Sequence, residues 1–231
     1  LANAHFTALG RAMMETNFTW FASKPRFNRV VSMSIEGQEH LDQAIATGRG
    51  VILLSAHFVV MELAARLFGQ THAFAAVYRK QSNPAYEAII TQNRAKHIPE
   101  LIDRLDLRAM VKWLKAGKIL WYAPDQDFGS KRSVFADFMG VQTATLKATT
   151  HLAALTNAVV IPTFFARDPK RRHHYIGHYG APLPIPSGDE VKDAQLYNDV
   201  LGAFVTRFPD QYLWIHRRFK TRPPGDPKFY A

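Results

Sequence analysis

His57 and Glu62 are the two residues whose types and spacing most directly suggest chemistry. They lie five positions apart, immediately after the apolar, strand-like segment 51–55. On a straight helix five positions correspond to a rotation of about 140°, so both side chains could not share one face in mid-helix. We therefore expect His57 at a strand-to-helix junction, turned back towards Glu62. A carboxylate on one imidazole nitrogen leaves the other free to deprotonate a hydroxyl group, which is a general-base arrangement.

Simpler interpretations of these residues stay open on the pattern alone. A histidine five positions before a glutamate is common by chance, and His57 could cap the helix while Glu62 is solvated. Ser55 lies two residues before His57 and could be considered as a nucleophile. The sequence has no Gly-x-Ser-x-Gly elbow, however, so a covalent serine mechanism is disfavoured.

Charged residues after other strand-like segments are candidates for substrate binding. Asp127 lies in the loop 122–129, Arg79 follows a strand-like segment, Arg132 lies further along the loop, and Arg218 belongs to a basic C-terminal group. The planar guanidinium fork of arginine can bind two phosphate oxygens at once. Solvated surface charge is the alternative for each of them. Because no second cluster of oxygen ligands accompanies the acidic loop, we expect no metal.

Composition limits the classes of function. The chain has 231 residues, is 47% hydrophobic and shows no break in composition, which predicts one domain over residues 1–231. Cysteine is absent, so disulfides and thiolate catalysis are excluded. The net charge of +10 indicates an anionic partner, such as a phospholipid surface, a phosphorylated substrate, an acidic protein or nucleic acid.

Helix-like and strand-like segments alternate along most of the chain. This alternation predicts right-handed βαβ units and an α/β fold with a mixed, largely parallel sheet flanked by helices. His57, Arg79 and Asp127 each follow an expected strand, so they should meet at the carboxyl edge of the sheet, where such folds bind ligands. The expected helices are 3–22, 37–47, 58–68, 83–96, 107–116, 143–157 and 190–207, and the expected strands are 51–55, 73–78, 119–122, 159–165 and 175–179.

Five blocks together resemble the late acyltransferases of lipid A biosynthesis, the lauroyl- and myristoyltransferase family within the lysophospholipid acyltransferase superfamily. They occur in the order found in that family and span most of the chain. The blocks are HFVVMELAARLFG (57–69), YR (78–79), WYAPDQDFG (121–129), SVFADFMG (133–140) and QYLWIHRRFKTRP (211–223).

The resemblance implies an activity and roles for individual residues. The H-x4-D/E motif of the family maps onto His57 and Glu62. It implies that His57 deprotonates a hydroxyl group of a lipid A precursor, that Glu62 orients His57, and that the acyl chain comes from an acyl carrier protein thioester without a further cofactor. Arg79 and the Asp127 loop would hold substrate or the pantetheine arm.

The resemblance also implies a glycerolipid-acyltransferase-like fold, an acyl carrier protein, a lipid A precursor and a membrane surface as partners, and a place on the cytoplasmic face of the inner membrane. Nucleic acid is not expected. Members of the family usually start with a membrane-anchoring helix, which we expect to be missing from this chain and which would leave it peripheral.

Two alternatives remain beside this interpretation. The same chemistry could act on a glycerolipid or a mannosylated lipid. Alternatively, the chain could be a non-catalytic basic module that binds a membrane or nucleic acid through its C-terminal basic group, Arg217, Arg218, Lys220 and Arg222.

Overall fold

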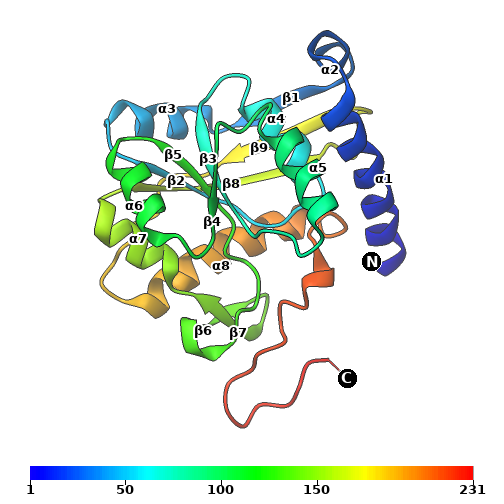
Figure 1. The fold of residues 1–231 in the computed structure, drawn as a ribbon. Helices are drawn as coiled ribbons and strands as arrows, with labels where there is room; N and C mark the ends of the chain where they lie inside the picture. The colour runs from blue at the N-terminus through cyan, green and yellow to red at the C-terminus, as the bar shows by residue number, and fades with distance from the viewer. Residues whose placement is uncertain (231) are drawn as a thin grey trace.

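A seven-stranded sheet with helices on both faces forms the centre of the computed structural model, which describes residues 1–230 (Figure 1). The strand order is β1-β9-β8-β2-β5-β3-β4. β8 and β9 pair antiparallel, whereas the other neighbours pair parallel, which confirms the predicted mixed, largely parallel sheet. The strands of this sheet are β1 (Ser32–Glu36), β2 (Val51–Leu54), β3 (Phe74–Tyr78), β4 (Glu100–Asp103), β5 (Ile119–Tyr122), β8 (Val159–Arg167) and β9 (His174–Tyr179).

The remaining elements cover the sheet and extend from it. A separate two-stranded hairpin consists of β6 (Ser133–Phe138) and β7 (Val141–Leu146), and it packs against α8. The helices are α1 (Ala2–Phe21), α2 (Lys24–Val30), α3 (Gln38–Ala46), α4 (Met61–Phe68), α5 (Pro84–Arg94), α6 (Leu107–Lys115), α7 (Ala148–Thr156) and α8 (Glu190–Arg207), with short 3-10 helices η1 (Ser130–Arg132) and η2 (Trp214–His216).

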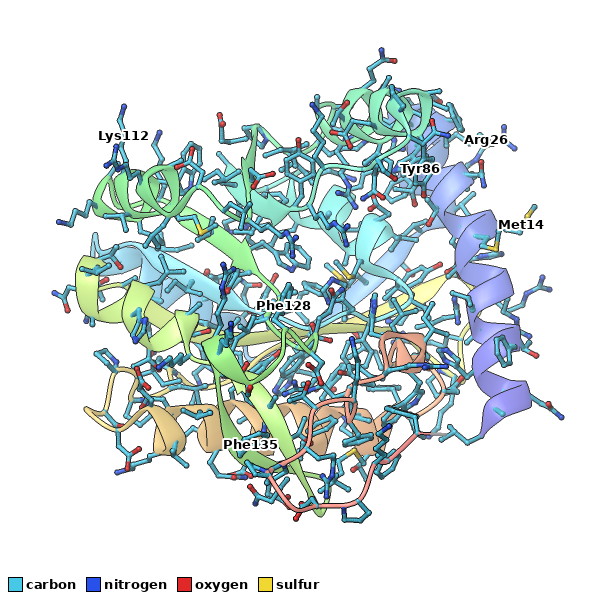
Figure 2. All side chains as sticks on the ribbon, turned by 60° about the horizontal axis from the view of Figure 1, so that its bottom comes forward. Met14, Arg26, Tyr86, Lys112, Phe128 and Phe135 are labelled. Atoms are coloured by element: carbon cyan, nitrogen blue, oxygen red, sulfur yellow. The ribbon has the colours of Figure 1, made fainter. Side chains whose placement is uncertain are left out.

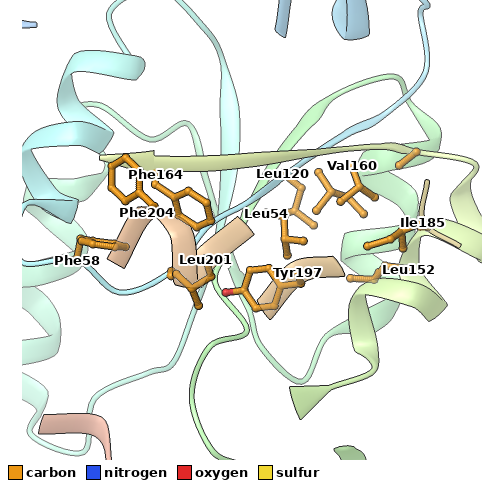
Figure 3. Packing of buried hydrophobic residues seen from close by; sticks show 14 of the residues in the cluster. Leu54, Phe58, Leu120, Leu152, Val160, Phe164, Ile185, Tyr197, Leu201 and Phe204 are labelled. Carbon is orange, nitrogen blue, oxygen red and sulfur yellow. The ribbon is translucent and has the colours of Figure 1, made fainter. Parts of the chain in front are cut away.

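Strand β2 is central and contributes to two hydrophobic cores, one on each face of the sheet. All four of its residues are buried, as expected for a parallel strand covered on both sides. Ile52 and Leu54 pack on the side of α6, α7 and α8, whereas Val51 and Leu53 pack on the side of α2, α3 and α4. Figure 3 shows the first of these cores, in which Leu54 lies near side chains of α8. The buried strand fixes the position at which the chain leaves the sheet before His57.

Several structural features differ from the elements expected from the sequence, among them the unexpected helix α2. β1 and β4 are short edge strands that carry polar residues, so their patterns did not stand out from loops. The β6-β7 hairpin occupies residues expected to be a loop and the start of a helix, so α7 begins at residue 148 rather than near 143. Met139 and Gly140 form its two-residue turn with positive φ values, a conformation usually signalled by Asn-Gly.

Helix α1 lies along one side of the molecule, and its two faces differ sharply (Figure 1). The inner face buries His5, Ala8, Ala12 and Thr19. The outer face exposes large apolar side chains, and Figure 2 shows Met14 pointing away from the sheet. These exposed residues are Phe6, Met13, Met14 and Phe21. Within residues 1–230 no helix combines the length and the apolar character needed to cross a bilayer.

Candidate active site

His57 lies in the connection between β2 and α4, where the C-terminal part of the chain holds the backbone. Its carbonyl oxygen accepts a hydrogen bond from the backbone N–H of Leu213, and the N–H of Val59 donates to the carbonyl oxygen of Gln211. Phe58 also forms an isolated β-bridge with Tyr212. The junction predicted for His57 is therefore confirmed, and a segment more than 150 residues away in sequence fixes its position.

Asp125 is the carboxylate that contacts His57. Leu54 and Tyr122 are partners at the ends of the parallel strands β2 and β5, and His57 and Asp125 each lie three residues beyond them. Asp125 Oδ1 lies 2.6 Å from His57 Nδ1, and Asp125 Oδ2 accepts a 3.0 Å hydrogen bond from the backbone N–H of His57. Two bonds to the same residue hold the imidazole in one orientation.

The electrostatics of this pair favour a charged Asp125. Burial raises the pKa of the Asp125 carboxyl, but the charge and hydrogen bonds of His57 and the positive charge of Arg218 lower it by more. Burial lowers the pKa of His57, but the Asp125 carboxylate raises it by more, so the net pKa lies above the usual histidine value. Because a carboxylate can only accept hydrogen bonds, neutral His57 carries its proton on Nδ1 and has a free lone pair on Nε2.

Glu62 does not contact His57, which corrects the predicted geometry of the pair. Helix α4 begins at Met61 rather than near Phe58, so three further residues separate His57 from the helix. Glu62 instead accepts hydrogen bonds from Trp20 Nε1 at 3.0 Å and from Arg94 Nε at 3.0 Å, and it forms a second contact with the Arg94 guanidinium. The predicted contact is wrong, whereas the catalytic role of either residue stays a prediction.

Replacing Glu62 by Ala should destabilise the fold, because it leaves Arg94 and the Trp20 indole without their shared acceptor. Hydrogen bonds to a charged group contribute about 1.5–3 kcal/mol, and partial exposure places the expected loss in free energy of unfolding at about 1–3 kcal/mol. Urea unfolding would measure this. Glu39→Ala, at an exposed position of α3, should change stability by less than about 0.5 kcal/mol. Equal stability of the two variants would show that the hydrogen bonds of Glu62 with Trp20 and Arg94 do not stabilise the fold.

The second nitrogen of His57 faces two further polar residues. The side-chain nitrogen of Gln126 lies 3.2 Å from His57 Nε2 and 3.3 Å from His216 Nε2. The two imidazole rings are 4.9 Å apart between centroids. The His57 side chain keeps 22% of its surface exposed, whereas Asp125 is 1% exposed. The His57 side chain therefore keeps partial access to solvent, while its Nδ1 is closed off by the buried Asp125.

The other predicted substrate-binding residues lie in three different environments. Arg79 and Arg132 are exposed, so the structure leaves both available to an anionic ligand. Asp127 is held by the C-terminal segment: it accepts hydrogen bonds from the backbone N–H and the hydroxyl of Thr221 and from the N–H of Gly129. Asp127 thus fastens a loop, and its contact with substrate stays a prediction.

Arg218 is buried rather than exposed. It is 1% exposed and donates to the carbonyl oxygen of Ala144, the hydroxyl of Thr145 and Oδ1 of Asn198. These contacts join the segment after η2 to the hairpin and α8, and the charge favours the ionised form of Asp125. The expected contact of Arg218 with substrate is therefore corrected to a structural role inside the protein.

The C-terminal basic group does not form a continuous basic surface. Arg218 is buried, and Arg222 bonds to Asp226 and to the carbonyl oxygen of Gln142. Arg217 and Lys220 are exposed. Two of the four residues proposed for a basic binding module are thus engaged within the protein, which weakens that alternative.

Sequence reasoning missed Asp125, Arg94, Gln126 and His216 as members of this site. Asp125 and Gln126 lie in the loop after the third expected strand, which the sequence analysis singled out. Their contact with His57 was not predicted. The missing information was the strand order, since the adjacency of β2 and β5 aligns Asp125 with His57. Arg94 and His216 come from α5 and η2, and no local pattern links them to residue 57.

The whole sequence is similar to a known family of bacterial enzymes. Residues 1–221 match the family model described as bacterial lipid A biosynthesis acyltransferase. The chain is 36% identical over 227 residues to the lipid A biosynthesis lauroyltransferase of Escherichia coli, covering 98% of this chain and 74% of that protein. It is also 36% identical to the palmitoleoyltransferase of the same organism, over 98% of this chain and 73% of the relative.

A more distant structural likeness is to the 1-acyl-sn-glycerophosphate acyltransferase of Thermotoga maritima. The crystal structure of that protein superposes with a TM-score of 0.46 at 16% identity, covering 85% of this chain and 78% of the other.

Proposed function

Because this chain belongs to the bacterial lipid A biosynthesis acyltransferase family, we propose that it transfers a fatty acyl chain from an acyl carrier protein thioester to a hydroxyl group of a lipid A precursor. The observation that carries the proposal is the His57–Asp125 pair at the carboxyl edge of the sheet, in which Asp125 binds Nδ1 and leaves Nε2 of a partly exposed His57 as the acceptor. This arrangement suits removal of a proton from a bound alcohol.

The reaction follows from the protonation state of this pair. Neutral His57 takes the hydroxyl proton on Nε2 while the oxygen attacks the thioester carbonyl carbon. The C–S bond then breaks, and the thiolate receives the proton from His57. Asp125 holds Nδ1–H in place throughout and stabilises the transient imidazolium. The two steps together return His57 to its neutral starting state.

Glu62 serves this site as a positioning residue for Arg94. Its carboxylate fixes the guanidinium, and Trp20 holds the carboxylate from α1. Arg94 lowers the pKa of His57, so its positive charge acts on the base and partly opposes Asp125. A fixed cation near the reacting atoms favours anionic groups of a substrate and the charge that develops during acyl transfer.

Apolar side chains and charged side chains of both signs lie near the carboxyl end of β4, at the edge of the sheet that carries the site. An open hollow there is lined by Leu105, Leu107 and Arg108 and by the acidic Asp103 and Asp106. Phe128, which follows Asp125 in the chain, packs 5.5 Å from the Arg104 guanidinium and is labelled in Figure 2. Exposed Leu105 and Leu107 offer apolar surface to an acyl chain, whereas the two carboxylates beside Arg108 give this hollow no preference for phosphate.

The overall charge supports two anionic partners. The chain carries a net charge of +10, and Arg79, Lys80 and Arg132 are exposed beyond β3 and β5. An acidic carrier protein and an anionic phospholipid surface would both be attracted to such a face. Salt should therefore slow transfer from a carrier-bound donor more than transfer from an uncharged thioester.

The test is to incubate the protein with acyl carrier proteins charged with chains of several lengths and with a choice of acceptors. A lipid A precursor, a lysoglycerophospholipid and a mannosylated lipid are offered separately, and mass spectrometry measures each product. We expect one added acyl group on the lipid A precursor and none on the other two. Acylation confined to the lysoglycerophospholipid or the mannosylated lipid would reassign the acceptor.

We also assign the outer face of α1 to contact with a membrane, on its cytoplasmic side. Its large exposed apolar residues share this face with uncharged Asn3, Gly10 and Asn17. The basic residues Lys24 and Arg26 follow at the end of the helix, where they would meet anionic headgroups.

Replacing Phe6 and Met14 by Ser should weaken binding to anionic phospholipid vesicles. Full burial of one such side chain contributes about 1.5–3 kcal/mol, so we expect at least about a tenfold loss in the vesicle partition coefficient. Leu155→Ser is the matched control, because Leu155 is 53% exposed on α7, a different helix. Equal losses in the two variants in a flotation assay would contradict the assignment of α1.

A further inference from the structure

The side-chain amide of Gln126 is placed between the catalytic base and a second histidine. Its nitrogen lies within hydrogen-bonding distance of Nε2 in both His57 and His216. An amide nitrogen carries two hydrogens and has no lone pair to share, so it can donate to both rings at once. Gln126 follows Asp125 directly, and the backbone that orients the base therefore also sets the position of this amide.

The protonation states of both rings agree with this arrangement. The Asp125 carboxylate keeps the proton of neutral His57 on Nδ1, which leaves Nε2 as an acceptor. Burial lowers the pKa of His216, the neighbouring His57 lowers it further and Asp125 raises it, and the net lowering favours a neutral ring, whose Nε2 accepts when Nδ1 carries the proton. One N–H of Gln126 thus donates to the Nε2 lone pair of His57, which is the lone pair that the reaction uses. The other N–H donates to Nε2 of His216.

Binding of the acceptor alcohol changes this arrangement. The hydroxyl must reach the same lone pair of His57, and a lone pair accepts one hydrogen bond. The alcohol therefore displaces one N–H of Gln126, whereas the bond to His216 keeps the amide in place. The freed N–H stays next to the attacking oxygen, whose target carbonyl lies about 3 Å away in a reactive geometry.

Three backbone N–H groups at the turn that carries His57 are already engaged. The N–H of His57 donates to Asp125 Oδ2, that of Phe58 to the carbonyl oxygen of Ala56, and that of Val59 to the carbonyl oxygen of Gln211. Acyl transfer develops negative charge on the thioester carbonyl oxygen, which needs a donor aimed at it. The side-chain amide of Gln126 is a donor already in place beside His57 Nε2.

We propose that the Gln126 amide donates a hydrogen bond to the thioester carbonyl oxygen as the tetrahedral intermediate forms, and that His216 is the positioning residue for this amide. The proposal rests on the proposed acyl transfer. The alcohol proton goes to His57 Nε2, the new C–O bond forms, and the carbonyl π electrons move onto the oxygen that Gln126 binds. When the C–S bond breaks, the thiolate takes the proton from His57 and the carbonyl re-forms.

Gln126→Met tests the donor, because methionine has a similar size and lacks the N–H. Loss of one oxyanion donor typically costs about 10²- to 10³-fold, so we expect kcat to fall by this factor while KM for the alcohol stays the same or decreases. Gln142→Met, at an exposed position of β7, is the control and should keep full kcat. A Gln126→Met variant with unchanged kcat would show that Gln126 merely covers the resting base and would overturn the proposal.

His216 is tested with two variants that differ in hydrogen bonding. His216→Leu removes the acceptor that holds Gln126 and should lower kcat about tenfold, whereas His216→Gln provides a carbonyl oxygen and should recover most of that loss. Equal kcat values for the two variants would overturn the positioning role. Both series use whichever acceptor the wild type acylates. A wild type that acylates no acceptor overturns the proposed function and this proposal with it, whereas an active wild type with an unaffected Gln126→Met variant overturns this proposal alone.

Discussion

Replacing His57 by Asn should reduce acyl transfer by about 10²- to 10⁴-fold, the typical contribution of a positioned general base. Asparagine can still offer an N–H to Asp125, so the buried carboxylate keeps a partner, but it cannot take a proton from the alcohol. The loss should appear in kcat, since the acceptor-binding surface is unchanged. Single-turnover transfer from a carrier-bound acyl chain would measure the chemical step directly.

A matched histidine elsewhere separates the loss of a base from the loss of any histidine. His151 lies on the surface of α7 and bonds to Glu190, so His151→Asn should leave transfer within about twofold of wild type. His57→Ala adds a second comparison. It removes the donor to Asp125 altogether and should lower the free energy of unfolding by about 1–3 kcal/mol, which His57→Asn should largely avoid. Full turnover by His57→Asn would refute the base assignment.

The sheet and the edge that carries the site were predictable because they follow from strongly patterned segments. The apolar run 51–54 is followed by a helix-forming segment, and the same pattern recurs at β3 and β5. In a largely parallel sheet all three strands end at one edge, so His57 and the loop after β5 had to come together.

The partner of His57 could not be predicted, because it depends on strand order and on where α4 begins. A spacing of five residues suggested a local pair, and the chain instead forms a pair 68 residues apart across adjacent strands. The same limitation explains Arg218. A run of basic residues resembles a surface patch, and its burial requires the hairpin and α8, whose contacts are not visible in a local pattern.

Two acidic residues of one loop, Asp125 and Asp127, have different partners although they lie only two positions apart. The sequence favoured Asp127 as the one near substrate. The loop directs Asp125 inwards to His57, while Asp127 binds Thr221 of the C-terminal segment. The two acidic residues marked this loop as a candidate site in the sequence, but the path of the backbone decides which carboxylate contacts His57.

Asp125→Asn should lower kcat by about 10²- to 10⁴-fold, because asparagine can offer an N–H to Nδ1 and so favour the wrong tautomer of His57. It should also move the acid limb of the pH profile to lower pH. In the wild type the Asp125 carboxylate raises the pKa of His57, whereas burial and Arg94 both lower it. Without the carboxylate, burial and Arg94 still lower the pKa of His57, so His57 stays unprotonated to lower pH and the residual kcat/KM persists there.

Asp127→Asn is the control for this pH profile. It weakens the contact with Thr221 and should leave the acid limb of the profile in place. An acid limb that does not move in Asp125→Asn would mean that this carboxylate does not set the protonation of the base.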